Sequence, residues 1–265
     1  TETRRHKSAL FSGSYHGIFD GVMAHEHEHG HPFPTSPGTP PDMVRDVRVL
    51  NYGTAASIDT IKNMGNTLAA VLVEPVQSRR PGFQPKEYLQ ELRKITQENG
   101  TALIFDEVLT GFRIHPGGCQ AHFGIQADIV TYGKIVTGGM PMGVVAGKAA
   151  FMDTVDGGMW QYGDDSFPQV SPTVFAGTFC KHPLSMAAAR AALIYMKTHG
   201  PGLQEAVNRR TAYFADTLNA FFKAEEIPVE VKYFSSVFRF ESFGKYSLAL
   251  HPIEMDLLFY LLLEK

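Results

Sequence analysis

The sequence has few cysteines, little excess charge of either sign and no apolar run long enough to cross a bilayer. Its 265 residues include two cysteines, Cys119 and Cys180, which form no CxxC pair. Two isolated thiols in a chain of this length favour a reduced, cytoplasmic protein over a disulfide-stabilised one. The net charge of −3, without a basic stripe, gives no electrostatic argument for binding nucleic acid or an anionic membrane.

Both ends of the sequence resemble the interior of a longer protein. The chain opens TETRRHKSALF, without an initiator Met or an apolar signal core, so secretion is not indicated. It closes on LHPIEMDLLFYLLLEK, a pattern typical of an apolar helix but without a cap or a glycine stop. This stretch is too short to span a membrane. We therefore expect a fragment that lacks both ends of its parent domain.

Residues 7–17 predict a short strand that runs into a glycine turn, and short apolar runs predict buried strands in residues 69–76, 101–108 and 128–134. Between the first two of these runs, residues 85–100 carry helix signals: a proline at the start, leucine and isoleucine at helical spacing, and Gly100 at the end. Strand, helix and strand in this order form a βαβ unit, and fully apolar strands suit a parallel sheet that is covered on both faces. The predicted fold class is α/β.

The C-terminal part has a different pattern. Residues 184–200 predict an alanine-rich helix, residues 203–226 a long amphipathic helix, and residues 229–242 two short strands. We therefore expect a large domain over residues 1–202 and the start of a small α+β domain over residues 203–265.

The segment 25–41 contains a histidine-rich tract that matches the zinc-protease pattern H-E-x-x-H. That pattern works on a helix, which places both histidines on one face beside a catalytic glutamate. Here several prolines follow directly and no apolar periodicity supports a helix. We predict a loop and no catalytic metal; chance metal affinity of the tract, or no function at all, are the alternatives.

Acidic residues follow two of the predicted strands. Glu74 follows the run 69–73, and Asp106 and Glu107 follow the run 102–105. In open α/β sheets, ligands bind beyond the carboxyl ends of the strands. Each acid alone is explained equally well as a solvent-facing carboxylate or a turn residue, so their meaning depends on what else lies at this edge.

One lysine lies there too. Lys134 is the only charged residue between Ile129 and Gly147. Burying it unpaired would be costly, so either it reaches water from a glycine-rich turn or the site needs an amine that can lose its proton. A lysine of this kind and a carboxylate on a neighbouring strand suit a Schiff base to a pyridine cofactor whose ring nitrogen pairs with the acid.

These residues stand in stretches that resemble a known family. EPV, LIFDEVLTGFR, DIVTYGKIVTGGMPMGVVAGK and FAGTFCKHPLSMAAARAAL occur in this order and are similar to the class III aminotransferases, especially the glutamate-1-semialdehyde aminomutase branch. EPVQSRRP and the C-terminal stretch resemble aminotransferase domains within hybrid polyketide–nonribosomal peptide synthetases, such as those that make microcystin and nodularin. The resemblance implies a fold-type I pyridoxal-phosphate-dependent transferase, with a three-layer large domain, a mostly parallel sheet and a small α+β domain.

The resemblance also implies roles for single residues. Lys134 would bind pyridoxal 5′-phosphate covalently and move a proton between substrate and cofactor, while Asp106 would bind the ring nitrogen. Val108 and Tyr15 would pack on opposite faces of the ring; as alternatives, both could be core residues. The family's phosphate-binding loop would precede Thr1, so this fragment alone could bind the cofactor weakly or fail to fold.

Other matching residues would lie around the cofactor. His16 would support the site, Glu74 would lie near the phenolic oxygen, and Thr178 would reach the phosphate bound by the opposite subunit, which implies a homodimer. Arg79 and Arg80 depart from the family pattern. They are candidates for an anionic substrate group or a phosphopantetheine arm, unless they are ordinary surface arginines. The long segment 152–172 could line a channel for a tethered chain or be a passive loop.

The resemblance implies an aminotransferase that moves an amino group from glutamate to a carbonyl, which we expect to be the β-keto group of a carrier-tethered polyketide chain. An aminomutase of the semialdehyde type is the alternative within the same class. A non-catalytic binding module or a histidine-rich metal-binding protein is the alternative from other classes.

Overall fold

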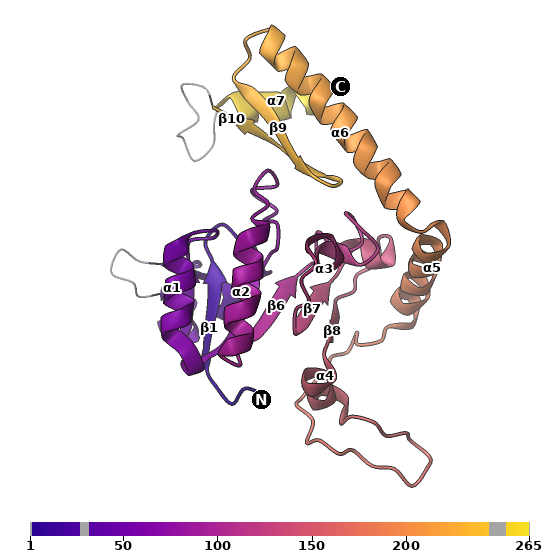
Figure 1. Cartoon of the computed structure of the whole chain (residues 1–265). Helices are drawn as coiled ribbons and strands as arrows, with labels where there is room; N and C mark the ends of the chain where they lie inside the picture. Colours follow the sequence, from indigo (N-terminus) through magenta and orange to yellow (C-terminus); the bar gives the residue numbers. More distant parts are fainter. Residues whose placement is uncertain (1, 27–31, 244–252, 265) are drawn as a thin grey trace.

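The computed structural model describes residues 2–26, 32–243 and 253–264. Its centre is a six-stranded sheet in the order β4-β1-β5-β6-β7-β8 (Figure 1). The strands are β1 (Lys7–Phe11), β4 (Val47–Leu50), β5 (Leu68–Val73), β6 (Ala102–Asp106), β7 (Ile129–Tyr132) and β8 (Val144–Gly147). Every neighbouring pair is parallel except β7 and β8. The predicted α/β class with a mostly parallel sheet is therefore confirmed.

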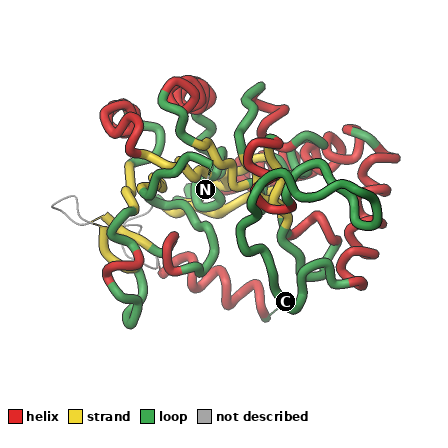
Figure 2. The backbone as a smooth tube through the Cα atoms, turned by 90° about the horizontal axis from the view of Figure 1, so that it is seen from below, coloured by secondary structure: helices red, strands yellow, loops and turns green. Residues whose placement is uncertain are grey.

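Two helices lie side by side on one face of this sheet, α1 (Ala55–Met64) and α2 (Lys86–Glu98) (Figure 1, Figure 2). The residues of α2 that gave the helical spacing, Leu89, Leu92 and Ile95, are buried in the main core. They pack with the inward side chains of β5 and β6, among them Val71 and Phe105. Because these strands are apolar on both faces, they lie at the centre of the sheet.

Several short elements were not predicted, namely β4, α1, β8, α3 (Gly118–Phe123) and α4 (Ala149–Asp156). Only one turn of apolar periodicity is visible in α1, and its start depends on a cap. The Thr54 hydroxyl oxygen accepts a hydrogen bond from the backbone N–H of Ser57 at 3.2 Å. Such caps stabilise helices whose apolar pattern is weak.

The prediction that segment 25–41 is entirely loop was wrong. Strand β2 (Ala24–Glu26) pairs in an antiparallel way with β3 (Pro32–Pro34). Two prolines are tolerated in β3 because a two-stranded ribbon needs few N–H donors, and a proline N can face away from its partner. Residues 27–31, which hold the rest of the histidine pattern, lie outside the described residues.

The C-terminal part contains two consecutive helices and a hairpin. Helix α5 (Pro183–His199) ends at Gly200, and α6 (Pro201–Ala224) follows directly; strands β9 (Val229–Phe234) and β10 (Val237–Ser242) precede α7 (Ile253–Leu263). The Asn219 amide ties α6 to β9, since its Oδ1 accepts from Val231 N at 2.7 Å and its Nδ2 donates to Val231 O at 3.1 Å. The division of the chain at residue 202 stays a prediction.

Asp128 joins the amino end of β7 to its surroundings. Its carboxylate accepts hydrogen bonds from Arg93 Nη1 at 2.8 Å, Lys148 Nζ at 2.7 Å and Leu103 N at 2.8 Å. Burial by itself raises the pKa of this carboxyl, but the hydrogen bonds from Lys148, Leu103 and Arg93 together hold the pKa below its ordinary value.

We expect Asp128→Asn to lower the free energy of unfolding by about 2–3 kcal/mol, because it leaves Arg93 with an incomplete partner in a largely buried position. A carboxyl whose pKa is lowered on folding stabilises the fold at neutral pH, and that contribution is lost as the pH falls through the lowered pKa. Urea unfolding at pH 7 and at acidic pH measures both effects, and the two proteins should converge in acid. Asp42→Asn, which alters an exposed pair with Arg45, is the control and should change little.

Candidate active site

The carboxyl ends of four parallel strands meet at one edge of the sheet. Asp106 is the last residue of β6 and is in register with Thr131 of β7. Lys134 lies three positions beyond Thr131, in a short 3-10 turn (Lys134–Thr137). Glu74 directly follows β5, and the segment 12–16 follows β1. The fold thus gathers at this edge the groups that the sequence analysis singled out.

The Asp106 carboxylate is held by three donors. Its Oδ2 lies 2.7 Å from Nδ1 of His16, and its Oδ1 accepts from Val108 N at 3.1 Å and from the Thr131 hydroxyl at 3.3 Å. The His16 side chain is 3% exposed and the Asp106 side chain 11%. His16 Nε2 is buried without a hydrogen-bond partner among the described residues. The carboxylate is therefore fixed in orientation and largely shielded from water.

Lys134 reaches water from a glycine-flanked turn, which is one of the two possibilities that the sequence left open. Its side chain is exposed, and its backbone has a φ of +47°, a region that L-residues rarely adopt. A non-glycine residue in this conformation is strained by about 1–3 kcal/mol, and such strain is concentrated at functional sites. Since Thr131 and Asp106 are register partners, the lysine follows a strand end directly adjacent to the carboxylate.

Val108 packs against the backbone in front of this lysine. A Cβ at Gly133 would lie 3.1 Å from Val108 Cγ1, closer than side chains normally approach. A side chain at position 133 would have to displace the half-buried Val108 side chain by a few tenths of an ångström, so glycine suits this position.

Glu74 clamps two backbone segments together. Its Oε2 accepts a hydrogen bond from Tyr15 N at 3.0 Å and its Oε1 accepts from Ser78 N at 3.2 Å. Burial raises the pKa of this carboxyl, while the two backbone donors oppose the rise. The clamp fixes the backbone of Tyr15, whose ring remains 50% exposed at the edge of the sheet.

Gln77 is a site residue that the sequence analysis missed. It is fully buried, and its Nε2 donates to Ser12 O at 2.7 Å and to Ser14 Oγ at 2.9 Å. Together with Glu74, it holds the turn that carries Tyr15 and His16. The only sequence signal for this role is a glutamine three positions after an acid at a strand end. That spacing is too common to indicate a site residue without the fold.

Glu107, next to Asp106, faces the other way. Its carboxylate accepts hydrogen bonds from Cys119 N at 2.6 Å and Gln120 N at 3.2 Å at the start of α3. Gly118 is required there, because a Cβ at this position would come within 2.3 Å of Glu107 Oε2. Burial raises the pKa of the Glu107 carboxyl. Since side chains alternate along an extended chain, only the first of the two acids faces the site.

The structure does not bring every expected residue to this edge. Thr178 is exposed in the segment that leads to α5, and its side chain makes no hydrogen bond with the described residues. Arg79 and Arg80 are exposed in the turn before α2, and the Arg80 guanidinium lies 4.7 Å from the centre of the Phe83 ring. Of the segment 152–172, residues 152–156 belong to α4, and residues 157–172 form a mostly exposed loop whose hydrogen bonds stay within residues 153–173.

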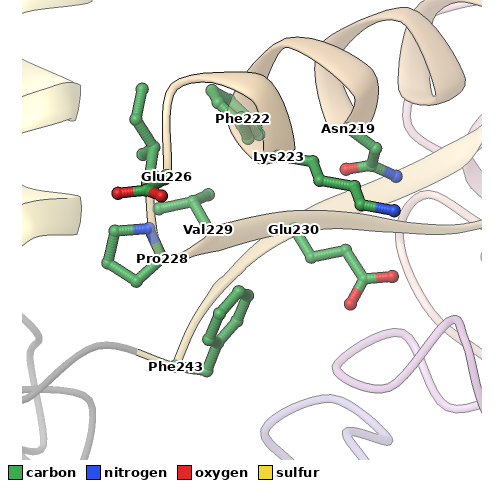
Figure 3. A pocket seen from close by; sticks show the side chains of 9 residues that line it. Asn219, Phe222, Lys223, Glu226, Pro228, Val229, Glu230 and Phe243 are labelled. Carbon is green, nitrogen blue, oxygen red and sulfur yellow. The ribbon is translucent and has the colours of Figure 1, made fainter.

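Two cavities lie in the C-terminal half. One of about 450 Å³ lies between the end of α6 and the start of β9, lined by Phe222, Val229 and Phe243 (Figure 3). Another of about 550 Å³ is lined mainly by apolar residues of the Lys134–Thr137 turn, α5 and α6, including Ile135, Met196 and Leu203. The second cavity adjoins the turn that presents Lys134.

Comparison with known proteins identifies the family. A model of the class-III aminotransferases (Aminotransferase class-III) matches residues 1–248. The chain belongs to this family. Within the family, the sequence is 40% identical over 195 residues to glutamate-1-semialdehyde 2,1-aminomutase of Methanothermobacter thermautotrophicus, which covers 72% of this chain and 43% of that protein. The chain spans about half the length of the curated relatives it matches.

Solved class III aminotransferase-like structures share the fold. A beta-phenylalanine aminotransferase from Variovorax paradoxus is 31% identical with a TM-score of 0.78, over 99% of this chain and 57% of that one. A transaminase with PLP bound is 27% identical with a TM-score of 0.76, over 90% of this chain and 54% of the other. These similarities agree with the architecture expected from the resemblance.

Neither a metal site nor a membrane-spanning helix is present in the described part of the chain. Over residues 2–26, 32–243 and 253–264, no group of three or more histidine, cysteine, aspartate or glutamate side chains is arranged to hold a metal ion. His27, His29 and His31 of the histidine tract lie outside these ranges. Over the same ranges, no helix has both the length and the apolar character needed to cross a membrane.

Proposed function

We propose that this chain carries the pyridoxal-phosphate site of an enzyme that transfers amino groups. The observation that carries the proposal is the position of Asp106 and Lys134 at the ends of adjacent strands, with Asp106 held by His16, Val108 and Thr131. Support comes from family membership and from a structural neighbour described with PLP bound.

The residues present fit the ring of this cofactor. A protonated pyridine nitrogen needs an ionised acceptor that is fixed and shielded, and Asp106 has three donors and little exposure. The aldehyde of the cofactor needs an accessible amine, and Lys134 is exposed at the same edge. When bound, the cofactor accepts electron density from the substrate bond next to the amino group.

The chain's own residues would divide the remaining tasks. The Asp106 carboxylate would hold the proton on the ring nitrogen, and His16 would keep that carboxylate in place. The Lys134 amine would bind the cofactor and carry the proton to and from the substrate carbon. The Tyr15 ring and the Val108 side chain would orient the cofactor ring and exclude water from it.

The acceptor we propose is a β-keto group on a carrier-tethered chain, with glutamate as the donor, as in a polyketide–nonribosomal peptide assembly line. The apolar cavity beside the Lys134 turn supports an extended acyl substrate, and the name of the Variovorax paradoxus enzyme supports chemistry on a β-amino acid. Two copies of the chain would form a dimer, with Thr178 binding the phosphate of the partner's cofactor.

A second candidate is amino transfer within one small molecule, favoured by the aminomutase names of the curated relatives.

The test uses the full-length protein that contains this chain, incubated with pyridoxal phosphate. Isotope-labelled glutamate and a 3-oxoacyl thioester should give 2-oxoglutarate and a 3-aminoacyl product by mass spectrometry. Glutamate-1-semialdehyde alone should remain unchanged. Its conversion to an isomer would favour the aminomutase, and a protein that releases no 2-oxoglutarate and converts neither substrate would overturn amino transfer altogether.

A further inference from the structure

Four basic residues from two distant parts of the sequence lie close to one another. Arg79 and Arg80 lie in the turn between β5 and α2, whereas Lys232 and Arg239 are register partners on β9 and β10. We call these four residues the cationic rim. Arg239 Nη1 donates to Arg79 O at 3.3 Å, and Lys232 Cδ lies 3.2 Å from where a Cβ at Gly82 would be. The basic residues of the β9–β10 hairpin therefore contact the turn between β5 and α2, which extends towards the hairpin in Figure 1.

The positive charge of the cationic rim is poorly compensated. Lys232 has an acidic partner, with its Nζ 2.6 Å from Glu230 Oε1. Among the residues that the structure describes, no carboxylate lies within 4.0 Å of a side-chain nitrogen of Arg79, Arg80 or Arg239. Lys232 and Arg239 place like charges directly opposite each other on paired strands, an arrangement that destabilises the pair. The Glu230 carboxylate and the Arg79 carbonyl offset part of this cost, and an anion bound from solvent would offset more of it.

One guanidinium of the rim is held in a defined orientation. Arg80 lies over the ring of Phe83, which itself packs edge-on against the buried Tyr52 at a centroid distance of 5.8 Å. Stacking occupies the face of a guanidinium and leaves the N–H groups on its edges available. Arg80 is thereby preorganised to donate hydrogen bonds to an anion in solvent.

The rim also borders the candidate active site through the backbone. Arg79 directly follows Ser78, whose N–H donates to Glu74, and the other oxygen of Glu74 holds Tyr15. The three arginines are exposed. Their position suits a part of the substrate that stays near solvent while another part reacts at the edge of the sheet.

We propose that the cationic rim binds the phosphate of a phosphopantetheine-type arm whose thioester-linked carbonyl reaches Lys134. The proposal rests on the proposed function, because it assigns a recognition site to the same acceptor. Guanidinium groups match phosphate oxygens in a bidentate way, and several converging cations suit a phosphate better than a single carboxylate. The arm could be a free thioester or be attached to a carrier protein, and both present the same phosphate chemistry.

The test compares two acceptors that differ by one phosphate, namely a 3-oxoacyl thioester of 4′-phosphopantetheine and the same thioester of pantetheine. For the full-length holoenzyme, we expect the phosphate to lower KM by about tenfold or more, as charge-assisted bidentate contacts typically do. In Arg239→Gln and Arg80→Gln this advantage should fall to about threefold or less. Arg210→Gln, an exposed arginine on α6 outside the rim, should retain it.

Calorimetry with phosphopantetheine alone gives a readout that does not depend on turnover. Equal binding of phosphopantetheine and pantetheine would show that the cationic rim does not bind the phosphate. The proposed function would still stand if either thioester is aminated. A protein that transfers no amino group but still binds phosphopantetheine more tightly than pantetheine would contradict the proposed function. Phosphate binding by the rim would then still be supported. If Arg239→Gln weakens binding of pyridoxal phosphate itself, the rim belongs to the cofactor and the proposal is wrong. A higher kcat/KM for the thioester attached to a carrier protein than for the free thioester would identify the carrier-attached arm as the substrate. Equal kcat/KM values would identify the free thioester as the substrate.

Discussion

Replacing Lys134 with alanine is expected to abolish covalent attachment of pyridoxal phosphate and to lower kcat by at least about 10³-fold. The residue would be both the amine that binds the cofactor and the base that moves the substrate proton, and loss of a positioned acid–base group alone typically costs about 10²–10⁴-fold. Borohydride reduction of the full-length protein, followed by peptide mass spectrometry, should place the cofactor on Lys134 in the wild type and nowhere in the variant.

The matched control is Lys94→Ala, an exposed lysine on α2. It should keep both the covalent adduct and the activity. An adduct that persists at full yield on another lysine in Lys134→Ala would show that the assignment is wrong. Because Lys134 has a positive φ, Lys134→Gly is a useful second variant: it removes the amine and also relieves the backbone strain, so equal loss of activity in both variants would exclude strain from the alanine side chain as the cause.

Replacing Asp106 with asparagine is expected to lower kcat by about 10²–10⁴-fold while the cofactor remains attached to Lys134. The amide oxygen can still accept from Val108 N, so the strand end should keep its shape. The negative charge that holds the proton on the pyridine nitrogen is lost, and the ring becomes a weaker electron acceptor. Single-turnover kinetics with glutamate separate this loss from a change in substrate binding.

The control for Asp106→Asn is Asp59→Asn, which removes a charge from the exposed face of α1. Unchanged amino transfer in Asp106→Asn, together with intact covalent cofactor, would contradict the role assigned to this carboxylate. His16→Gln should give an intermediate loss, because the glutamine amide can still donate to Asp106 but cannot match the rigidity of the ring.

Much of the large sheet was predictable because its strands are short, apolar on both faces and separated by clear helix or turn signals. Leu89, Leu92 and Ile95 predicted both α2 and its buried side. The elements that were missed, such as β4 and α1, have weak patterns that only become stable through capping by Thr54 or through pairing with β1. The small ribbon of β2 and β3 was missed for the same reason: its prolines oppose strand formation in general, yet they are acceptable where few ladder bonds are needed.

Sequence alone determined which reactive groups this protein has and where they stand relative to its strands, because apolar runs that end in an acid or a lysine indicate strand ends. Lys134, Asp106 and Glu74 were identified in this way. The tertiary structure decided which groups lie together. Register placed Asp106 opposite Thr131, alternation turned Glu107 towards α3, and the packing of the β-hairpin brought Arg239 to Arg79. These relations depend on contacts between residues far apart in the chain, and no local pattern encodes them.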